Sequence, residues 1–212
     1  MNITWYGQTC FRINSRKNKN GQLSILIDPF TKEIGLRAPK LEADILLFTD
    51  PNAPLFLFKK EAKSEEIISA FPITGPGEYD VKGVYIEGIL AQDRTIYTIE
   101  SEEIKICHLG KLSQKELTPS QLERIGDIDV LMIPIGGGET INPEEAIKIM
   151  AQIEPKITIP MYYQIPKLKI KLESLTKFLK SLGISSLPPI AKLSLKKKDV
   201  PKDEAKIIVL QP

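Results

Sequence analysis

Metal-binding side chains are scarce in this sequence. The 212 residues include a single histidine, His108, and two cysteines, Cys10 and Cys107. A catalytic zinc site normally takes three protein ligands, most often imidazoles or thiolates, and one water. One histidine and two cysteines cannot build such a site in the ordinary way. Two cysteines are also too few for a disulfide framework, so the expected location is the reducing cytoplasm.

Long apolar runs are absent as well. No segment approaches the roughly 18 consecutive apolar residues that a membrane-spanning helix needs. The first residues, Met1–Tyr6, lack the basic start and apolar stretch of a signal peptide and are typical of a strand. Because no linker or repeat interrupts the chain, we expect one soluble domain over residues 1–212, with no membrane contact.

The charge is small but unevenly distributed. The net charge is +2, yet the segment from Lys167 to the C-terminus holds eleven lysines and four acidic residues. Such a basic region can attract nucleic acid or an acidic partner. The lysines alternate with apolar residues, however, and no nucleic-acid-binding motif accompanies them. A solvated lysine-rich face is the simpler interpretation, and nucleic-acid association is the weaker alternative.

Short apolar segments bounded by turn residues predict a strand-rich first half. The expected strands are Ile3–Tyr6, Cys10–Ile13, Leu23–Ile27, Ile45–Phe48, Val84–Leu90, Thr95–Ile99 and Ile104–Cys107. The second half alternates strands and helices. Helices are predicted from Thr118 to Ile125, after the cap Asn142 up to Pro155, and along the apolar stripe Leu172–Leu182. The expected strands there are Val130–Ile133, Ile157–Ile159 and Ile207–Leu210.

Seven segments then occur in an informative order. They are Trp5–Phe11, Leu26–Phe30, Ala43–Thr49, Gly75–Tyr79, His108–Gly110, Asp129–Pro134 and Ile159–Tyr163. In this order the chain resembles the metallo-β-lactamase superfamily, in its short branch of lactonase-like zinc hydrolases, over nearly its whole length. The resemblance implies an α/β fold, a four-layer αββα sandwich of two mixed β-sheets flanked by helices. It also implies a metal site at one edge, where loops at the strand ends converge.

The metal ligands of this family are missing at the positions that match. The motif His-x-His-x-Asp-His would follow Thr49, where its histidines fall on Asp50, Asn52 and Leu55 and its aspartate on Pro54. The remaining positions of the pattern carry Gln8 after the first glycine, Lys111 for the bridging aspartate and Tyr162 for the late histidine. The resemblance does not make His108 a ligand, and we expect it to be hydrogen-bonded within the protein.

Lys111 is the replacement that argues most strongly against a bound metal ion. A carboxylate that bridges two zinc ions compensates their charge, whereas an ammonium group repels a nearby cation. We therefore expect Asp50 to pair with Lys111 in place of a metal. We predict no cofactor, although the family would imply zinc.

Other chemistry receives less support. Asp28, Asp50, Asn52 and Glu78 could hold Mg²⁺ through oxygen ligands, but Asp28 and Glu78 are more typical of structural turns. A cysteine nucleophile would need a neighbouring base, and Cys107 and His108 should point to opposite faces of a strand. Gly136–Gly138 lacks the spacing of a phosphate-binding loop and favours a plain connection.

The leading hypothesis is a pseudoenzyme: a metallo-β-lactamase-like protein that has lost its zinc site and acts as a binding or scaffold subunit. Its vestigial site would comprise Gln8, Asp50, Asn52, Leu55, Lys111 and Tyr162, with Asp28, Glu78 and His108 as pocket neighbours. The partner would be an unknown protein or a second copy of the chain. The alternative is a hydrolase with a rebuilt site at the same edge of the sandwich.

Overall fold

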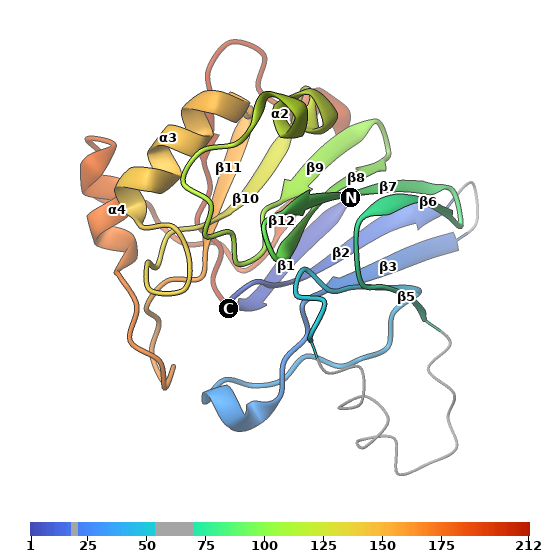
Figure 1. The fold of residues 1–212 in the computed structure, drawn as a ribbon, viewed down its shortest axis with the longest axis horizontal. Coiled ribbons are helices and arrows are strands. Elements are labelled where there is room, and N and C mark those ends of the chain that lie inside the picture. The colour runs from blue at the N-terminus through green and yellow to red at the C-terminus, as the bar shows by residue number, and fades with distance from the viewer. Residues whose placement is uncertain (18–20, 54–69) are drawn as a thin grey trace.

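Two mixed β-sheets form the frame of the molecule (Figure 1). The structure is a computed structural model, and it describes residues 1–17, 21–53 and 70–212. Both sheets contribute to one large apolar cluster, which includes Ile3 and Ile25 from the first sheet and Ile99 and Met132 from the second. Burial of such side chains is the main favourable term in folding.

The first sheet has the strand order β12-β1-β2-β3-β4-β5. Its strands are β1 (Asn2–Gly7), β2 (Cys10–Lys17), β3 (Gly21–Ile27), β4 (Ile45–Leu47), β5 (Phe71–Ile73) and β12 (Leu193–Ser194). The strands β12, β1, β2 and β3 pair antiparallel, whereas β3, β4 and β5 run parallel. A parallel connection has to cross from one end of the sheet to the other. The segment between β3 and β4 is such a crossing, and it includes the short 3₁₀ helix η2 (Lys32–Ile34).

The second sheet has the order β13-β11-β10-β9-β8-β7-β6. Its strands are β6 (Gly77–Val81), β7 (Val84–Ala91), β8 (Arg94–Ser101), β9 (Ile104–His108), β10 (Val130–Pro134), β11 (Ile157–Met161) and β13 (Lys206–Ile207). Strands β9, β10, β11 and β13 run parallel, and β6 to β9 are antiparallel. All five residues of β10 and of β11 are buried, as expected for parallel strands covered on both faces.

Three α-helices accompany the second sheet, and Figure 1 shows them together on one side of it. They are α2 (Pro119–Ile125), α3 (Pro143–Ile153) and α4 (Leu175–Ser181). The caps Thr118 and Asn142 each form a capping box followed by proline, which fixes the starts of α2 and α3. A second 3₁₀ turn, η3 (Lys197–Asp199), precedes β13.

A smaller apolar cluster lies on the opposite face of the first sheet. It contains Cys10, Leu26, Leu46 and Phe48, with Tyr6, Phe30 and Leu41 packed against it. Side chains alternate between the two faces of a strand, so Leu26 points to this cluster while Ile25 and Ile27 point to the large one. The first sheet is therefore apolar on both faces.

The predicted elements agree with the structure except in a few places. The first two predicted helices are confirmed, but the third is shorter, because Ser174 caps α4 and its helical residues begin at Leu175. The last predicted strand lies earlier, at Lys206–Ile207, and the prediction omitted β5, β6 and β12. Within the described ranges no helix is long and apolar enough to cross a membrane. The predicted sandwich of two mixed sheets with flanking helices is confirmed.

Candidate functional site

Parallel strands from both sheets end at one edge of the sandwich. Thr49 follows β4, and its carbonyl accepts a hydrogen bond from the Thr95 amide of the second sheet at 2.9 Å. Tyr162 follows β11, and its amide donates to the carbonyl of Gln8 in the first hairpin at 3.1 Å. The carboxyl ends of parallel strands are where ligands commonly bind in α/β proteins. We call this region, formed by Gln8, Asp28, Thr49, His108, Lys111 and Tyr162, the strand-end edge.

Three non-glycine residues of the strand-end edge have left-handed backbone conformations. The φ angles are 53° at Gln8, 44° at Asp28 and 51° at Tyr162. This conformation is uncommon for residues with a Cβ and is retained when the surrounding structure enforces it. Strained residues of this kind concentrate at functional sites, which marks the edge as the candidate site.

The carboxylate of Asp28 is committed to holding the first sheet together at this edge. One oxygen accepts the Thr49 amide at 2.7 Å, and the other accepts the Thr49 hydroxyl at 2.6 Å. The Asp28 amide in turn donates to the carbonyl of Leu47 at 2.9 Å. These bonds fix the turn after β3 against the end of β4. Asp28 thus positions backbone, as an aspartate closing a strand turn should.

His108 is fully buried at the end of β9, and both of its ring nitrogens are occupied. Nδ1 accepts the Gly110 amide at 3.1 Å, and Nε2 lies 2.9 Å from the carbonyl oxygen of Thr9. An amide can only donate, so Nδ1 is unprotonated and the proton is on Nε2, which donates to Thr9. Burial lowers the pKa of His108, although Asp28 and the Thr9 hydrogen bond oppose this shift. This is the internally hydrogen-bonded position that we predicted.

Neither cysteine has the surroundings of a nucleophile. Cys107 is buried between the sheets and Cys10 in the smaller cluster. Burial raises the pKa of both thiols, so both stay protonated at neutral pH. Cys10 and Cys107 therefore belong to the packed core.

Lys111 and Asp50 do not pair with each other, so that prediction is wrong. The Lys111 ammonium lies 3.6 Å from a carboxylate oxygen of Glu139 and 5.5 Å from the centre of the Tyr162 ring. Asp50 lies 3.4 Å from the guanidinium of Arg94. Arg94, at the start of β8, reaches Asp50 from the second sheet, whereas Lys111 turns toward the end of β11. Each charge thus has a different partner from the predicted one.

Tyr162 and Gln8 are the other polar side chains at this edge. Tyr162 is 2% exposed, and burial, with a smaller contribution from Glu139, raises the pKa of its phenol to about 12. The phenol therefore stays protonated and can donate a hydrogen bond at any physiological pH. Gln8 is 8% exposed, and its amide nitrogen has no hydrogen-bond partner among the described residues. A buried donor without a partner is costly in a folded protein and often marks a place where a ligand or water binds.

The remaining predicted site residues are not brought into this group. Asn52 is exposed, and its backbone amide donates a hydrogen bond to the carboxylate of Asp50 at 2.9 Å. Glu78 is exposed on β6, where it interacts with Tyr85. Leu55 and Pro54 lie outside the described residues. Gly136 approaches the carbonyl oxygen of Tyr162 so closely that a Cβ there would lie 2.1 Å from it, which explains a glycine in the connection after β10.

The described donors at this edge do not fit a zinc site of the usual kind. Within residues 1–17, 21–53 and 70–212, no three His, Cys, Asp or Glu side chains are grouped so that they could hold a metal ion. Both oxygens of Asp28 and both nitrogens of His108 are engaged within the protein. Lys111 adds a positive charge next to Tyr162. No step of the chemistry is therefore assigned to a metal held by these residues.

Two mixed sheets with a candidate site at the ends of their parallel strands define a sandwich of the metallo-β-lactamase class. A family model described as the β-lactamase superfamily domain matches residues 2–162. The chain belongs to this superfamily.

Similar proteins include a crystal structure from Thermotoga maritima, a candidate Zn-dependent hydrolase of the metallo-β-lactamase superfamily. It is 32% identical, covers 100% of both chains and superposes with a TM-score of 0.78. A UPF0173 protein of Pyrococcus abyssi is 30% identical over 77% of this chain and 83% of its own. A relative from Methanocaldococcus jannaschii, named UPF0173 metal-dependent hydrolase, is 23% identical over 88% of this chain and 96% of its own.

These relatives correct two predictions. The hypothesis of a non-catalytic scaffold subunit is wrong, because the relatives are hydrolases by name. The prediction that no cofactor is used is contradicted by the same names, which specify metal dependence or zinc. Self-association, a protein partner and nucleic-acid association stay predictions.

Sequence reasoning missed three residues of the strand-end edge and its surroundings. Thr49 anchors Asp28, Arg94 pairs with Asp50, and Glu139 pairs with Lys111. Thr49 could have been predicted from the sequence, because it directly follows a buried strand. Arg94 and Glu139 have no local signal, since each reaches the edge from a segment remote in sequence from its partner.

Proposed function

We propose that the protein is a hydrolase that acts at the strand-end edge, through a site rebuilt relative to the histidine motif of its family. The names of its relatives support hydrolysis as the reaction class. The observation that carries the location is the convergence of Gln8 and Tyr162, two left-handed residues joined by a backbone hydrogen bond between the sheets.

Three side chains around this point are suited to stabilise a developing oxyanion. The Lys111 ammonium lies against the Tyr162 ring, and the Tyr162 phenol keeps its proton. The amide nitrogen of Gln8 lacks a partner among the described residues. Donors fixed in advance at a buried site stabilise negative charge in a transition state, and each typically contributes 10²–10³ in rate, or about 3–4 kcal/mol.

Two carboxylates are candidates for accepting the proton of an attacking water: Glu139, which pairs with Lys111, and Asp50, which directly follows Thr49 of the strand-end edge. Glu139 lies beside Lys111 at 3.6 Å and is largely exposed, whereas Asp50 is partly buried and oriented by Arg94. A general base has to lie within hydrogen-bond reach of the proton that it accepts, directly or through one water. The favoured reaction is attack of water on a carbonyl or phosphoryl centre, with Lys111 and Tyr162 facing the oxygen that gains charge.

The relatives are metal-dependent by name, so the activity has to be tested with and without added metal ions. The described residues supply no zinc shell, so we assign none of them as a ligand. A metal that supports the reaction would supply the activation of water or the polarisation of the substrate. Lys111, Tyr162 and Gln8 would still act on the substrate oxygen.

The test is a turnover screen of the full-length protein against ester, lactone and phosphodiester substrates. Each substrate is assayed after chelation and after addition of Zn²⁺, Mn²⁺ or Mg²⁺. We expect turnover with at least one substrate class, reduced at least about tenfold in Lys111→Gln and in Tyr162→Phe. Lys198→Gln, an exposed lysine in η3, should retain full activity. Absence of turnover in every metal state, or equal activity in all variants, would contradict the proposal.

A further inference from the structure

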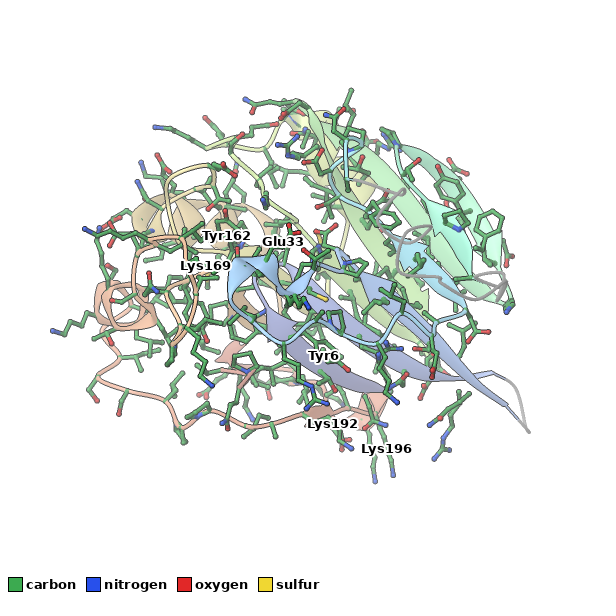
Figure 2. The ribbon with its side chains drawn as sticks, turned by 90° about the horizontal axis from the view of Figure 1, so that it is seen from below. Tyr6, Glu33, Tyr162, Lys169, Lys192 and Lys196 are labelled. Carbon is green, nitrogen blue, oxygen red and sulfur yellow. The ribbon has the colours of Figure 1, made fainter. Side chains whose placement is uncertain are left out.

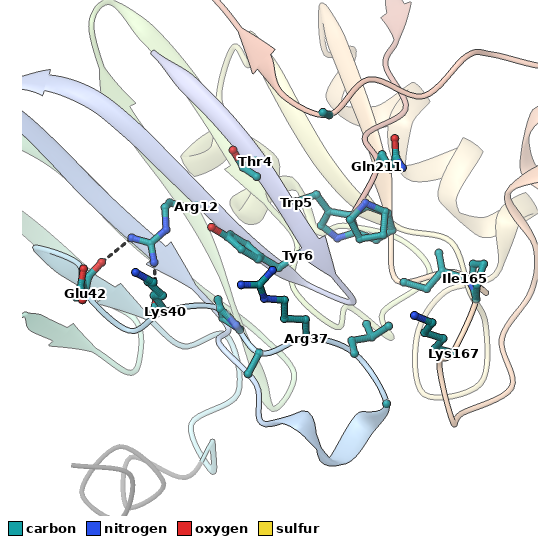
Figure 3. A pocket seen from close by; sticks show the side chains of 17 residues that line it. Thr4, Trp5, Tyr6, Arg12, Arg37, Lys40, Glu42, Ile165, Lys167 and Gln211 are labelled. Atoms are coloured by element: carbon teal, nitrogen blue, oxygen red, sulfur yellow. Dashed lines mark hydrogen bonds between the residues drawn. The ribbon is translucent and has the colours of Figure 1, made fainter. Parts of the chain in front are cut away.

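A cavity lies away from the strand-end edge, on the outer side of the first sheet. Its volume is about 980 Å³, at the upper end of the range for small-molecule pockets. Figure 3 shows Thr4, Tyr6 and Arg12 of β1 and β2 on one side and Ile165 and Lys167 on another. The segment that carries Leu36 and Arg37 closes the third side. We call this cavity the basic groove.

Two segments remote in sequence form one end of the groove together. The amide of Lys169 donates to the carbonyl of Ile34 at 3.1 Å. At Gly35 a Cβ would lie only 2.2 Å from the carbonyl oxygen of Lys167, so the two backbones touch there. Figure 2 shows Glu33 and Lys169 near each other in agreement with these contacts. Backbone contacts between these two segments therefore form a continuous wall at this end of the groove.

The charges that line the groove are strongly unbalanced. Its ionisable side chains are Arg12, Arg37, Lys40 and Lys167, against the single carboxylate of Glu42. Arg37, Lys40 and Lys167 are exposed, and within the described ranges none of them forms an ion pair. Such a concentration of like charge around a concave surface attracts anions.

Among the described residues, Arg12 is held by neutral oxygens. Its guanidinium donates to the Ser24 hydroxyl at 2.8 Å, to the Glu42 carbonyl at 2.5 Å and to the Lys40 carbonyl. These bonds tie the 40–42 segment to β2, and no carboxylate of the described residues forms an ion pair with Arg12. Arg12 thus fixes the geometry of the groove and adds to its positive potential.

The floor of the groove is apolar and rigid. The half-buried ring of Tyr6 lies on this outer face of the first sheet. Trp5 supports it from the inner face: it is 1% exposed, and its ring lies 5.0 Å from the Tyr163 ring and 6.3 Å from the Phe11 ring, measured between centroids. Leu36 and Ile165 add aliphatic surface, and both are close to Gly7 in the first hairpin. An apolar floor with a cationic rim matches a molecule that has one acidic group and an apolar body.

From this combination we infer that the basic groove binds a small amphipathic anion, an organic acid whose carboxylate meets Arg37 and Lys167 while its apolar part covers Tyr6 and Leu36. The inference is independent of the proposed hydrolysis. Because its readout is binding, a failure here and a failure of turnover are distinguishable.

The groove contains its own optical probe, since Trp5 is the only tryptophan of the chain. The anionic dye 8-anilinonaphthalene-1-sulfonate is titrated into the full-length protein, and energy transfer from Trp5 to the dye is recorded. We expect saturable transfer that dodecanoate displaces and that dodecanol displaces at least about tenfold more weakly. Each exposed charge pair of this kind contributes about twofold to fivefold in affinity, so Arg37→Gln combined with Lys167→Gln should weaken binding roughly fivefold to twentyfold.

The matched control is Lys198→Gln combined with Lys202→Gln, which removes two exposed lysines that do not line the groove. It should leave the affinity for the dye unchanged. The inference is overturned if both double variants weaken binding equally, if dodecanol competes as well as dodecanoate, or if no transfer from Trp5 occurs. It is also overturned if transfer requires dimerisation in size-exclusion chromatography, because the groove would then be an interface between copies.

Discussion

The backbone amide of Gly110 donates a hydrogen bond to Nδ1 of His108 at 3.1 Å. Gly110 has a φ of 57°, which turns the chain back over the imidazole directly after β9. The bond determines the tautomer of the only histidine in the chain. The other ring nitrogen, Nε2, donates to the Thr9 carbonyl and so ties the end of β9 to the hairpin of the first sheet. A shortage of histidine thus leaves one imidazole whose role is structural.

We predict that His108 is neutral at pH 7, with its proton on Nε2, and that its pKa in the folded protein lies below the ordinary value. Protonation of Nδ1 would break the Gly110 bond and place a charge in the core, so the folded pKa is lowered. The unfolded chain binds a proton near pH 6.5 and the folded chain does not, so stability falls as the pH drops from about 6.5 through the folded pKa.

Nitrogen NMR of the single imidazole measures both properties without ambiguity. A proton on Nδ1 at neutral pH would contradict the hydrogen bonds described here, and so would a titration midpoint at or above 6.5.

A second prediction concerns Thr49, whose hydroxyl donates to Asp28 at 2.6 Å. Thr49→Val keeps the shape but leaves a carboxylate oxygen without its partner. We expect a loss of about 1.5–3 kcal/mol in the free energy of unfolding, the usual range for a hydrogen bond to a charged group. Thr49→Ser keeps the hydroxyl and should lose less than about 1 kcal/mol, the value of one methyl group. Urea denaturation at pH 7 compares the two variants with the wild type. Equal stability of Thr49→Val and the wild type would refute the role assigned to the hydroxyl.

A third prediction uses two glycines with similar backbone conformations. Gly110 and Gly138 have φ angles of 57° and 67°. A Cβ at Gly110 would lie 2.5 Å from Cβ and Oγ1 of Thr49, whereas one at Gly138 would have nothing within 4 Å. Gly138→Ala should therefore cost only the left-handed strain of about 1–2 kcal/mol, and Gly110→Ala should cost more. Thermal unfolding of the two variants measures the difference. Equal midpoints would contradict the prediction, because they would show that Thr49 can move away from the new Cβ at no loss of stability.

A fourth prediction concerns Asp129, which anchors the end of the second sheet. Its carboxylate accepts hydrogen bonds from Lys156 and Lys197, each at 2.8 Å. Burial favours the protonated form of Asp129, but these bonds outweigh it and lower the pKa. Asp129→Asn should cost roughly 1.5–3 kcal/mol at pH 7, the range for a hydrogen bond to a charged group.

The pH dependence of this cost gives a sharper test. A lowered folded pKa means that the stabilisation is present above the unfolded pKa, about 3.9, and is lost as the pH falls through the folded pKa. The difference between wild type and Asp129→Asn should therefore shrink below pH 4. Asp127→Asn, at an exposed neighbouring position, should change little at any pH. A difference that stays constant down to pH 2.5 would argue against an ionised Asp129 as the cause.

Local patterns explain why most of the fold was predictable. The capping boxes at Thr118 and Asn142 depend on residues three positions apart, and the structure reproduces both helix starts. Buried parallel strands such as Val130–Pro134 stand out as continuous apolar segments. The omitted strand β12 has two residues and pairs with β1, about 190 positions earlier in the chain, so its neighbours in sequence give no signal.

The contacts within the candidate site were not predictable from the sequence. The family pattern placed Gln8, Asp50, Lys111 and Tyr162 near one edge, and the strand ends meet there. The pairing of charges was not predictable, because it depends on which strand ends face each other: Arg94 reaches Asp50, and Glu139 reaches Lys111. The function was misjudged because missing ligands were equated with missing activity, whereas the relatives are hydrolases by name.

The sequence by itself determined the scaffold, since apolar periodicity and helix caps are local properties that restrict each segment to one conformation. It also determined that only one imidazole exists in the chain. The tertiary structure decided what that imidazole does, because Thr9 and Gly110 occupy its nitrogens from two different elements. It also decided that Arg12, Arg37 and Lys167 share one groove, since hydrogen bonds between segments over 130 residues apart bring their charges together.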